Sequence, residues 1–351
     1  MIKNTIDIGT RHIGDGHPTF IIAEAGINHQ GELSIAKELV KQAKECGADA
    51  VKFQKRSVGR ILTREGLDAP YENPNSFGKT YGEHKEALEL TEAEYVELKK
   101  YCDDLEIIFC ASGWDEESID FLMSLNIAFF KMASADLTNY PLLRHTAKKN
   151  IPMILSTGMA DLDMVRDAYE LVREINPAVA ILQCTSTYPT VFEEINLNVI
   201  TTYKQEFPEA VIGYSGHEKG IAIPPVAIGM GAKIVERHFT LDRTMKGGDH
   251  AASLEPAGFE KMVRDIRHTE EALGSYAKNI QESELPIFKK LAKSIVSAHD
   301  IAKGETITAD KLTTKGPGSG ISPTKMGEII GKVALRDIMA DEVIIEEDVQ
   351  W

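Results

Sequence analysis

Charged and hydroxyl side chains recur where short apolar runs end, and these residue types could bind and activate a small substrate together. The runs end, in chain order, with Glu24, Lys52 and Gln54, Ser112, Lys131 and Ser134, Ser156, Thr185, Ser215 and His238. A lysine inside a run such as "AVKFQ" costs several kcal/mol if it is buried without a partner. Two lysines and four serines directed at one place would bind a small anion through phosphate or carboxylate oxygens.

Each of these residues also has a purely structural interpretation. A single serine at a strand end is commonly a local hydrogen-bond donor, and Lys52 and Lys131 could each pair with a structural carboxylate. The functional interpretation rests on all of them meeting at one rim.

His217 and His238 are the candidate metal ligands, because they follow neighbouring expected strands. Two histidines without a cysteine or a third strong ligand suit a partly hydrated divalent ion better than structural zinc. Two hydrogen-bonded structural histidines are the alternative.

The elements that must position these residues are short strands alternating with amphipathic helical segments. The expected strands cover residues 20–26, 50–54, 107–112, 128–134, 152–158, 178–185, 210–216 and 233–239. Near-continuous apolar strands separated by helices indicate a parallel sheet covered by helices, and eight such units in about 250 residues are typical of a TIM (β/α)8 barrel. A doubly wound open sheet is the rival fold. In a barrel, the strand ends meet at the rim where active sites lie.

The alternation of apolar strands and amphipathic helices ends after residue 276, and the sequence predicts three parts. A barrel domain covers 1–276, a polar linker covers 277–290, and a small β-rich domain covers 291–351.

Composition excludes several classes of protein. The net charge of −15 disfavours nucleic acid and anionic membranes as partners, and 43% hydrophobic residues are enough for a substantial core. No signal peptide or membrane span is expected, and four cysteines without a CxxC pair suggest reduced thiols. The expectation is a soluble cytoplasmic protein.

Several long motifs together resemble the sialic acid synthase family, with a C-terminal antifreeze-like SAF domain. They are "FIIAEAGINHQG", "GADAVKFQK", "QCTSTYPT", "IGYSGHEKG" and "ERHFTLDRTMKGGDHAASLEP". The resemblance implies condensation of phosphoenolpyruvate with N-acetylmannosamine or its 6-phosphate.

The resemblance also implies roles for individual residues. Glu24 would be the acid/base, and His217 and His238 would bind a divalent ion, usually manganese, with magnesium or cobalt as alternatives. Phosphoenolpyruvate would be bound by Lys52, Ser112, Lys131, Ser134, Ser156 and Ser215. The sugar would be contacted by Gln54, Asp136, Tyr188 and Asp249. In the resembled family the C-terminal domain caps the partner's barrel in a domain-swapped homodimer, and we expect Lys315 on its loop to be a further sugar contact.

Two departures concern the sugar. Gly316 stands where members using the free sugar have an arginine, and Gly216 replaces an aspartate before the first metal histidine. A lysine-rich cap including Lys315 could instead meet a sugar phosphate. Other possible functions are a synthase for legionaminic, pseudaminic or KDN-type acids, a metal-dependent barrel aldolase, and a non-catalytic carbohydrate- or ice-binding protein.

Overall fold

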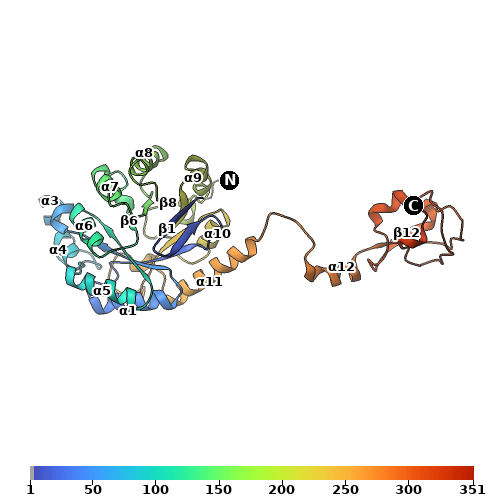
Figure 1. Cartoon of the computed structure of the whole chain (residues 1–351). Coiled ribbons are helices and arrows are strands. Elements are labelled where there is room, and N and C mark those ends of the chain that lie inside the picture. Colours follow the sequence, from blue (N-terminus) through green and yellow to red (C-terminus); the bar gives the residue numbers. More distant parts are fainter. Residues whose placement is uncertain (1–3) are drawn as a thin grey trace. The chain divides into compact units, whose positions relative to one another are not determined.

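A computed structural model describes residues 4–351 of the chain. It contains two compact units, of which one ends at Gly274 and the other runs from Ser275 to Trp351 (Figure 1). The first three residues of the predicted barrel domain 1–276 lie outside the described part. Among residues 4–351, none of the helices combines the length and the hydropathy that crossing a bilayer requires.

The first unit is built on eight parallel strands, which confirms the predicted TIM-barrel fold. They are hydrogen-bonded in the order β5-β4-β3-β10-β9-β8-β7-β6, and the two end strands, β5 and β6, pack against each other. The strands are β3 (Phe20–Gly26), β4 (Ala50–Lys55), β5 (Ile108–Gly113), β6 (Phe130–Met132), β7 (Met153–Ser156), β8 (Val179–Cys184), β9 (Val211–Gly216) and β10 (Ile234–His238).

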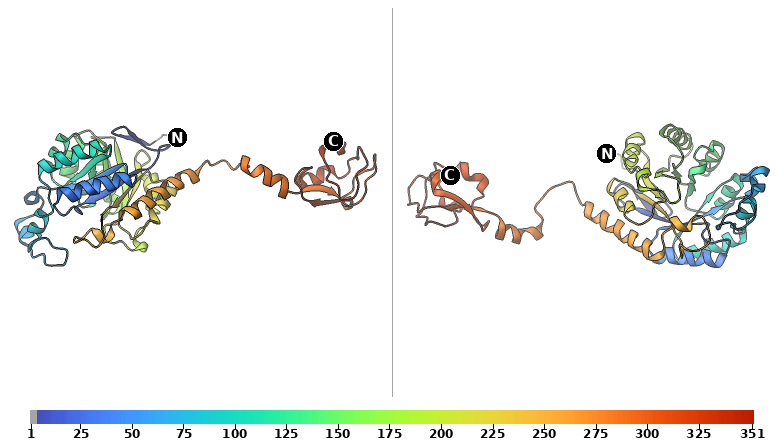
Figure 2. Two further views of the ribbon diagram at one scale, coloured as in Figure 1. Left: turned by 90° about the horizontal axis from the view of Figure 1, so that it is seen from below. Right: turned by 180° about the vertical axis from the view of Figure 1, so that it is seen from behind.

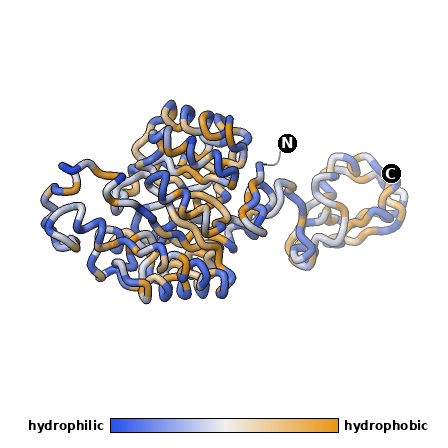
Figure 3. Tube along the Cα trace, turned by 60° about the vertical axis from the view of Figure 1, so that its left-hand side comes forward, coloured by the Kyte–Doolittle hydropathy of each residue, from blue (hydrophilic) through white to orange (hydrophobic). Residues whose placement is uncertain are grey.

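Eight helices follow the eight strands and surround them (Figure 2). They are α1 (Leu33–Glu45), α5 (Glu92–Asp104), α6 (Glu116–Ser124), α7 (Tyr140–Ala147), α8 (Leu162–Arg173), α9 (Val199–Glu206), α10 (Ile223–Gly229) and α11 (Pro256–Leu273). In α8 the buried residues Val165, Ala168 and Val172 recur every three or four positions, which places them on the face that covers the sheet. Figure 3 shows the same alternation of apolar and polar residues along the barrel helices.

Side chains inside the barrel change character along the strands. At the amino ends they form an apolar cluster that includes Phe20, Ile22 and Ile154. Two residues further along β3 the inward position is Glu24, because side chains alternate between the two faces of a strand. The barrel interior is therefore apolar at the amino ends of the strands and polar at the rim where the strands end.

An N-terminal hairpin, which the sequence analysis did not predict, joins the apolar cluster. Its strands β1 (Thr5–Ile8) and β2 (Arg11–Gly14) are antiparallel. Ile8 and Ile13 are fully buried against the interior residues at the amino ends of the strands. The hairpin therefore covers the barrel end opposite the polar rim.

The connection between β4 and α5 is the longest in the barrel and carries three short helices, α2 (Val58–Ile61), α3 (Arg64–Asp68) and α4 (Tyr81–Glu86). Thr80 begins α4 with a capping box, in which its hydroxyl accepts from the backbone N–H of Glu83. The ring of His84 packs between Tyr71 and Tyr81, with centroids 4.6 and 6.2 Å away. These contacts fix the position of the next residue, Lys85.

The second unit has its own small core. Two antiparallel strands, β11 (Ser294–Ser297) and β12 (Leu312–Lys315), and the short helix α13 (Met326–Ile329) surround buried Ile295, Ile307 and Ile338. A further helix, α12 (Leu285–Leu291), begins in the segment 277–290 that was predicted as a polar linker and ends one residue beyond it.

Candidate active site

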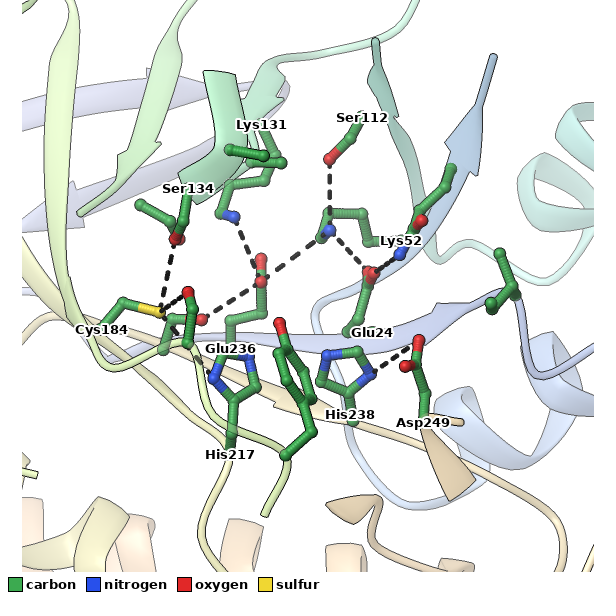
Figure 4. A pocket seen from close by; sticks show the side chains of 18 of the residues that line it. Glu24, Lys52, Ser112, Lys131, Ser134, Cys184, His217, Glu236, His238 and Asp249 are labelled. Carbon is green, nitrogen blue, oxygen red and sulfur yellow. Dashed lines mark hydrogen bonds and ion pairs between the residues drawn. The ribbon is translucent and has the colours of Figure 1, made fainter. Parts of the chain in front are cut away.

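A cavity opens at the carboxyl ends of the barrel strands and is lined by most of the predicted site residues (Figure 4). These are Glu24, Lys52, Gln54, Ser112, Lys131, Ser134, Ser156, Tyr188, Ser215, His217, His238 and Asp249. Two predicted residues do not line it. Asp136 faces a neighbouring cavity, and Lys315 lies in the second unit, where its ammonium pairs with Asp341.

Glu24 is held at the rim by an irregularity in its strand. The register of β3 against β4 shifts between Glu24 and Gly26. Gly26 adopts a φ of +54°, and a β-carbon there would lie 3.1 Å from Glu24 Oε1 and 3.2 Å from Gln54 Nε2. Glycine is therefore required for the backbone to approach this carboxylate so closely.

The floor of the cavity is a buried network of two lysines and two glutamates. Lys52 Nζ lies 2.7 Å from Glu24 Oε2 and 3.8 Å from Glu236 Oε1, and Lys131 Nζ lies 3.2 Å from Glu236 Oε1. All four side chains are at most 6% exposed. Buried charges of this kind persist only as partners of one another, and Glu236 lies between the two ammonium groups (Figure 4).

The two glutamates differ in their pKa values. Burial raises the pKa of Glu24, Lys52 opposes this effect, and the nearby Glu236 adds to it. Burial also acts on Glu236, but Lys131 and Lys52 outweigh it and lower the pKa of Glu236 to about 2. Glu236 is thus a permanent anion, whereas Glu24 is suited to exchange a proton.

The serines extend the network around the lysines. Lys52 Nζ donates to Ser112 Oγ over 3.3 Å, and Ser215 Oγ donates to Glu236 Oε1 over 3.4 Å. Ser134 Oγ accepts from the backbone N–H of Gly158, and Ser156 Oγ is buried without a partner. Unpaired buried polar atoms are rare, so Ser156 Oγ is suited to bind an oxygen of a ligand.

The two histidines lie side by side beside this network. Their ring centroids are 5.2 Å apart, and His217 Nδ1 donates to the carbonyl oxygen of Thr185 over 2.7 Å. The Nε2 lone pair of His217 is therefore free to bind a metal. His238 Nδ1 is buried without a hydrogen bond, and burial lowers the pKa of His238 to about 3, so its imidazole is neutral.

The histidines fit a divalent ion held by two imidazoles. Within residues 4–351, no group of three or more His, Cys, Asp or Glu residues is placed to hold a metal. Two imidazole ligands match a partly hydrated ion rather than a closed structural site.

The mouth of the cavity carries groups suited to a sugar. The centre of the Tyr188 ring lies 4.1 Å from that of the His217 ring, with the two planes tilted by 39°. Asp249 Oδ2 lies 3.9 Å from His238 Nδ1, and Gln54 Nε2 donates to Glu24 Oε1 over 3.1 Å. An aromatic face with carboxylate and amide groups is suited to bind a polyhydroxylated molecule.

Sequence reasoning missed several residues of the site. Glu236 and Cys184 point inward with His238 and Ser215, and Lys85 and Trp114 reach the cavity from connecting segments. Glu236 stands two residues before His238 on β10, so the alternation along a strand could have identified it. Arg237, between them, points outward and is fully buried, with its Nη1 2.6 Å from Glu218 Oε1.

Taken together, the cavity can hold an anion above two lysines and place a second molecule near the histidines and Glu24. One carboxylate can exchange a proton, and two imidazoles can bind a metal. Such a site can join two small molecules while protecting them from bulk water.

Comparison with known proteins places the chain in a family. Residues 39–278 match the NeuB family and residues 292–350 match the SAF domain. Human N-acetylneuraminate-9-phosphate synthase is 47% identical over 338 residues, which cover 96% of this chain and 94% of that protein. The N,N'-diacetyllegionaminic acid synthase of Legionella pneumophila is 39% identical and covers 97% of this chain and 98% of that protein.

A crystal structure gives the same result. The N-acetylneuraminic acid (sialic acid) synthetase of Leptospira borgpetersenii, in complex with citrate, superposes with a TM-score of 0.72 at 32% identity. The superposition covers 81% of this chain and 95% of the Leptospira chain. The resemblance read from the motifs is thereby confirmed, and the chain belongs to the NeuB family.

Proposed function

We propose that this protein condenses phosphoenolpyruvate with N-acetylmannosamine or its 6-phosphate and releases inorganic phosphate. The observation that carries the proposal is the buried floor of Lys52, Lys131 and Glu236 beneath Glu24 and the histidine pair. Relatives with this activity in their names match almost the whole chain.

In the proposed reaction, phosphoenolpyruvate lies on the floor, with its anionic groups near Lys52, Lys131 and the serines. Its methylene carbon attacks the aldehyde carbon of the open-chain sugar, which forms the new carbon–carbon bond. Water then adds to the cationic carbon that carried the phosphate, and phosphate leaves by cleavage of the carbon–oxygen bond. The cavity holds the two reactants together, which removes most of the entropic cost of their encounter.

The chain's own residues have separate tasks in this scheme. Lys52 and Lys131 orient the anion, and Tyr188, Gln54 and Asp249 hold the sugar. Glu24 moves a proton at the sugar oxygen, for which its raised pKa is suited. A divalent ion on His217 and His238, for which we propose manganese, would polarise the aldehyde oxygen.

The second unit also has a proposed role. We propose that the SAF domain of one chain covers the barrel mouth of a second copy in a homodimer and brings Lys315 towards the sugar. Two-fold dimers are the commonest assemblies, and this small unit has its own core. We also propose the cytoplasm as the compartment, because all four cysteines are free thiols among the described residues.

The test is phosphate release measured with phosphoenolpyruvate and a sugar, each alone and together. Release that requires both substrates is the expected result, and the sugar is offered in parallel as free and 6-phosphorylated N-acetylmannosamine. Cleavage of a sugar acid without phosphoenolpyruvate would instead identify a metal-dependent aldolase. Turnover only with a diacetamido sugar would identify a synthase of the legionaminic type, which the 39% identity to the Legionella enzyme makes a specific alternative.

A further inference from the structure

A second cavity adjoins the candidate active site. It is lined by Arg56, Arg60, Tyr81, Lys85, Trp114 and Asp136, among others, and it shares Lys85, Trp114 and Ala135 with the first. Its volume is about 550 Å³, against about 280 Å³ for the first cavity. A substrate bound at the histidines can therefore extend into this second space.

Arg56 is the best-buried cation of the second cavity, with only 2% of its surface exposed. Its Nε donates to Glu89 Oε1 over 2.5 Å, and its guanidinium carbon lies 5.7 Å from the centre of the Trp114 ring. Arg56 Nη2 and Trp114 Nε1 are nevertheless buried without hydrogen-bond partners. A buried guanidinium with an unused donor is costly unless a ligand supplies the acceptor.

Lys85 completes a group of donors on the wall shared by the two cavities. It is half-buried, and no ion pair or hydrogen bond of its ammonium is found between residues 4 and 351. Burial and the nearby Arg56 lower the pKa of Lys85 to about 8, while Asp249 opposes them. Glu89 pairs with Arg56, and Lys85 has no carboxylate partner within the described residues, so a phosphate would supply its counter-charge.

Neighbouring carboxylates pair with the two arginines, Arg56 with Glu89 and Arg60 with Glu117, but none pairs with Lys85 among residues 4–351. Asp115 accepts from the backbone N–H groups of Ser57 and Ser118, and Glu89 already accepts from Arg56. Asp136 Oδ1 accepts from Asn139, but Asp136 Oδ2 is buried without a partner. That oxygen can accept a hydrogen bond from a hydroxyl group, which is the only donor a phosphorylated sugar offers beside its amide.

We propose that the second cavity binds the phosphate monoester of a 6-phosphorylated N-acylhexosamine, with Arg56, Lys85 and Trp114 as donors and Asp136 accepting from a sugar hydroxyl. This inference rests on the proposed function and deepens it, because it makes the phosphorylated sugar the preferred substrate. It places the phosphate in the barrel rather than on Lys315 of the SAF domain.

The test compares kcat/KM for the phosphorylated and the free sugar in variants of the full-length protein. Lys85→Met is expected to lower the ratio of the two values by about 10- to 100-fold, the range for one charge-assisted hydrogen bond. Trp114→Phe keeps the ring beside Arg56 but removes one donor, and it should lower the same ratio several-fold. Lys79→Met, an exposed lysine in the same connection, is the matched control and should leave the ratio unchanged.

The proposal is overturned if Lys85→Met leaves the ratio unaltered, or if only Lys315→Met changes it. The KM for phosphoenolpyruvate is measured in the same variants, because the second cavity could instead bind the phosphate of that substrate. If Lys85→Met raises the KM for phosphoenolpyruvate and leaves the KM for the sugar unchanged, the proposal is also overturned. If wild-type protein releases no phosphate with either sugar, the proposed function fails independently. Calorimetric binding of the phosphorylated and free sugars to wild type and Lys85→Met then decides the phosphate site, and equal affinities would refute it.

Discussion

Replacing Glu236 with glutamine would test whether its charge holds the floor of the cavity together. The variant preserves the shape of the side chain but removes the anion between two lysines. Lys131 Nζ and Lys52 Nζ lie 3.2 and 3.8 Å from Oε1, and in the variant Lys52 would keep Glu24 as its partner while Lys131 would lose the one carboxylate it pairs with among residues 4–351. The expected result is a less stable barrel, because a buried cation that loses its partner is strongly destabilising.

The size of the loss follows from the pKa. The pKa of Glu236 is lowered from 4.5 to about 2, and a difference of roughly 2.5 units corresponds to about 3 kcal/mol of unfolding free energy at neutral pH. Because the pKa in the folded state is depressed, this stabilisation is complete above about pH 4.5 and is lost as the pH falls towards 2. At pH 3 less than about half of it should remain.

Urea unfolding followed by circular dichroism at pH 7 and pH 3 would measure this difference between wild type and Glu236→Gln. Glu97→Gln is the control, since Glu97 pairs with Lys37 at the surface with 57% of its side chain exposed, and such pairs contribute less than about 1 kcal/mol. A loss at pH 7 no larger than that of the control would refute the reasoning, as would a difference that does not shrink in acid.

Four further predictions concern the reaction and the fold. Glu24→Gln should reduce kcat by about 100-fold with little change in the KM for phosphoenolpyruvate, and a large rise in that KM would instead assign Glu24 to holding Lys52. His217→Ala and His238→Ala should each lose bound manganese, measured by elemental analysis, and most activity; full activity of chelated wild type would exclude the metal. Truncation near residue 280 should leave a folded barrel, seen by circular dichroism, without synthase activity, and mixing it with the Glu24→Gln chain should restore some activity if the SAF domain acts in trans. Burial lowers the pKa of His29 to about 4, so the unfolded chain binds more protons than the folded chain below about pH 6.5. The free energy of unfolding measured in urea should therefore fall by about 2 kcal/mol from this group between pH 7.5 and pH 5. A free energy of unfolding that does not change over this pH range would contradict the prediction.

The eight strands could be predicted because each is buried on both faces and reads as a nearly continuous apolar run. Residues at the strand ends could then be assigned to one rim, and twelve of the fourteen predicted site residues do line one cavity. The N-terminal hairpin was missed because Arg11 and His12 are exposed and its strands have only four residues each. Such short polar strands have no strong periodic pattern.

The second cavity could not be predicted, because it depends on contacts between distant segments. Arg56 is buried through Glu89, 33 residues away, and Lys85 is oriented by a connection that has no barrel periodicity. Lys315 was assigned from the resemblance, and its pairing with Asp341 joins residues 26 positions apart. The sequence contains the partners in both cases, but nothing local indicates which of many carboxylates each cation meets.

The hairpin β1–β2 also constrains the order of events in the cavity. Because Ile8 and Ile13 cover one end of the barrel, a ligand reaches the floor from the rim in the described part of the chain. A molecule on Lys52 and Lys131 must therefore arrive before one that rests against Tyr188 and Asp249, and the deeper ligand cannot depart until the upper one has left. The steady-state kinetics should show an obligatory sequence, with the carboxylate substrate first and the sugar second.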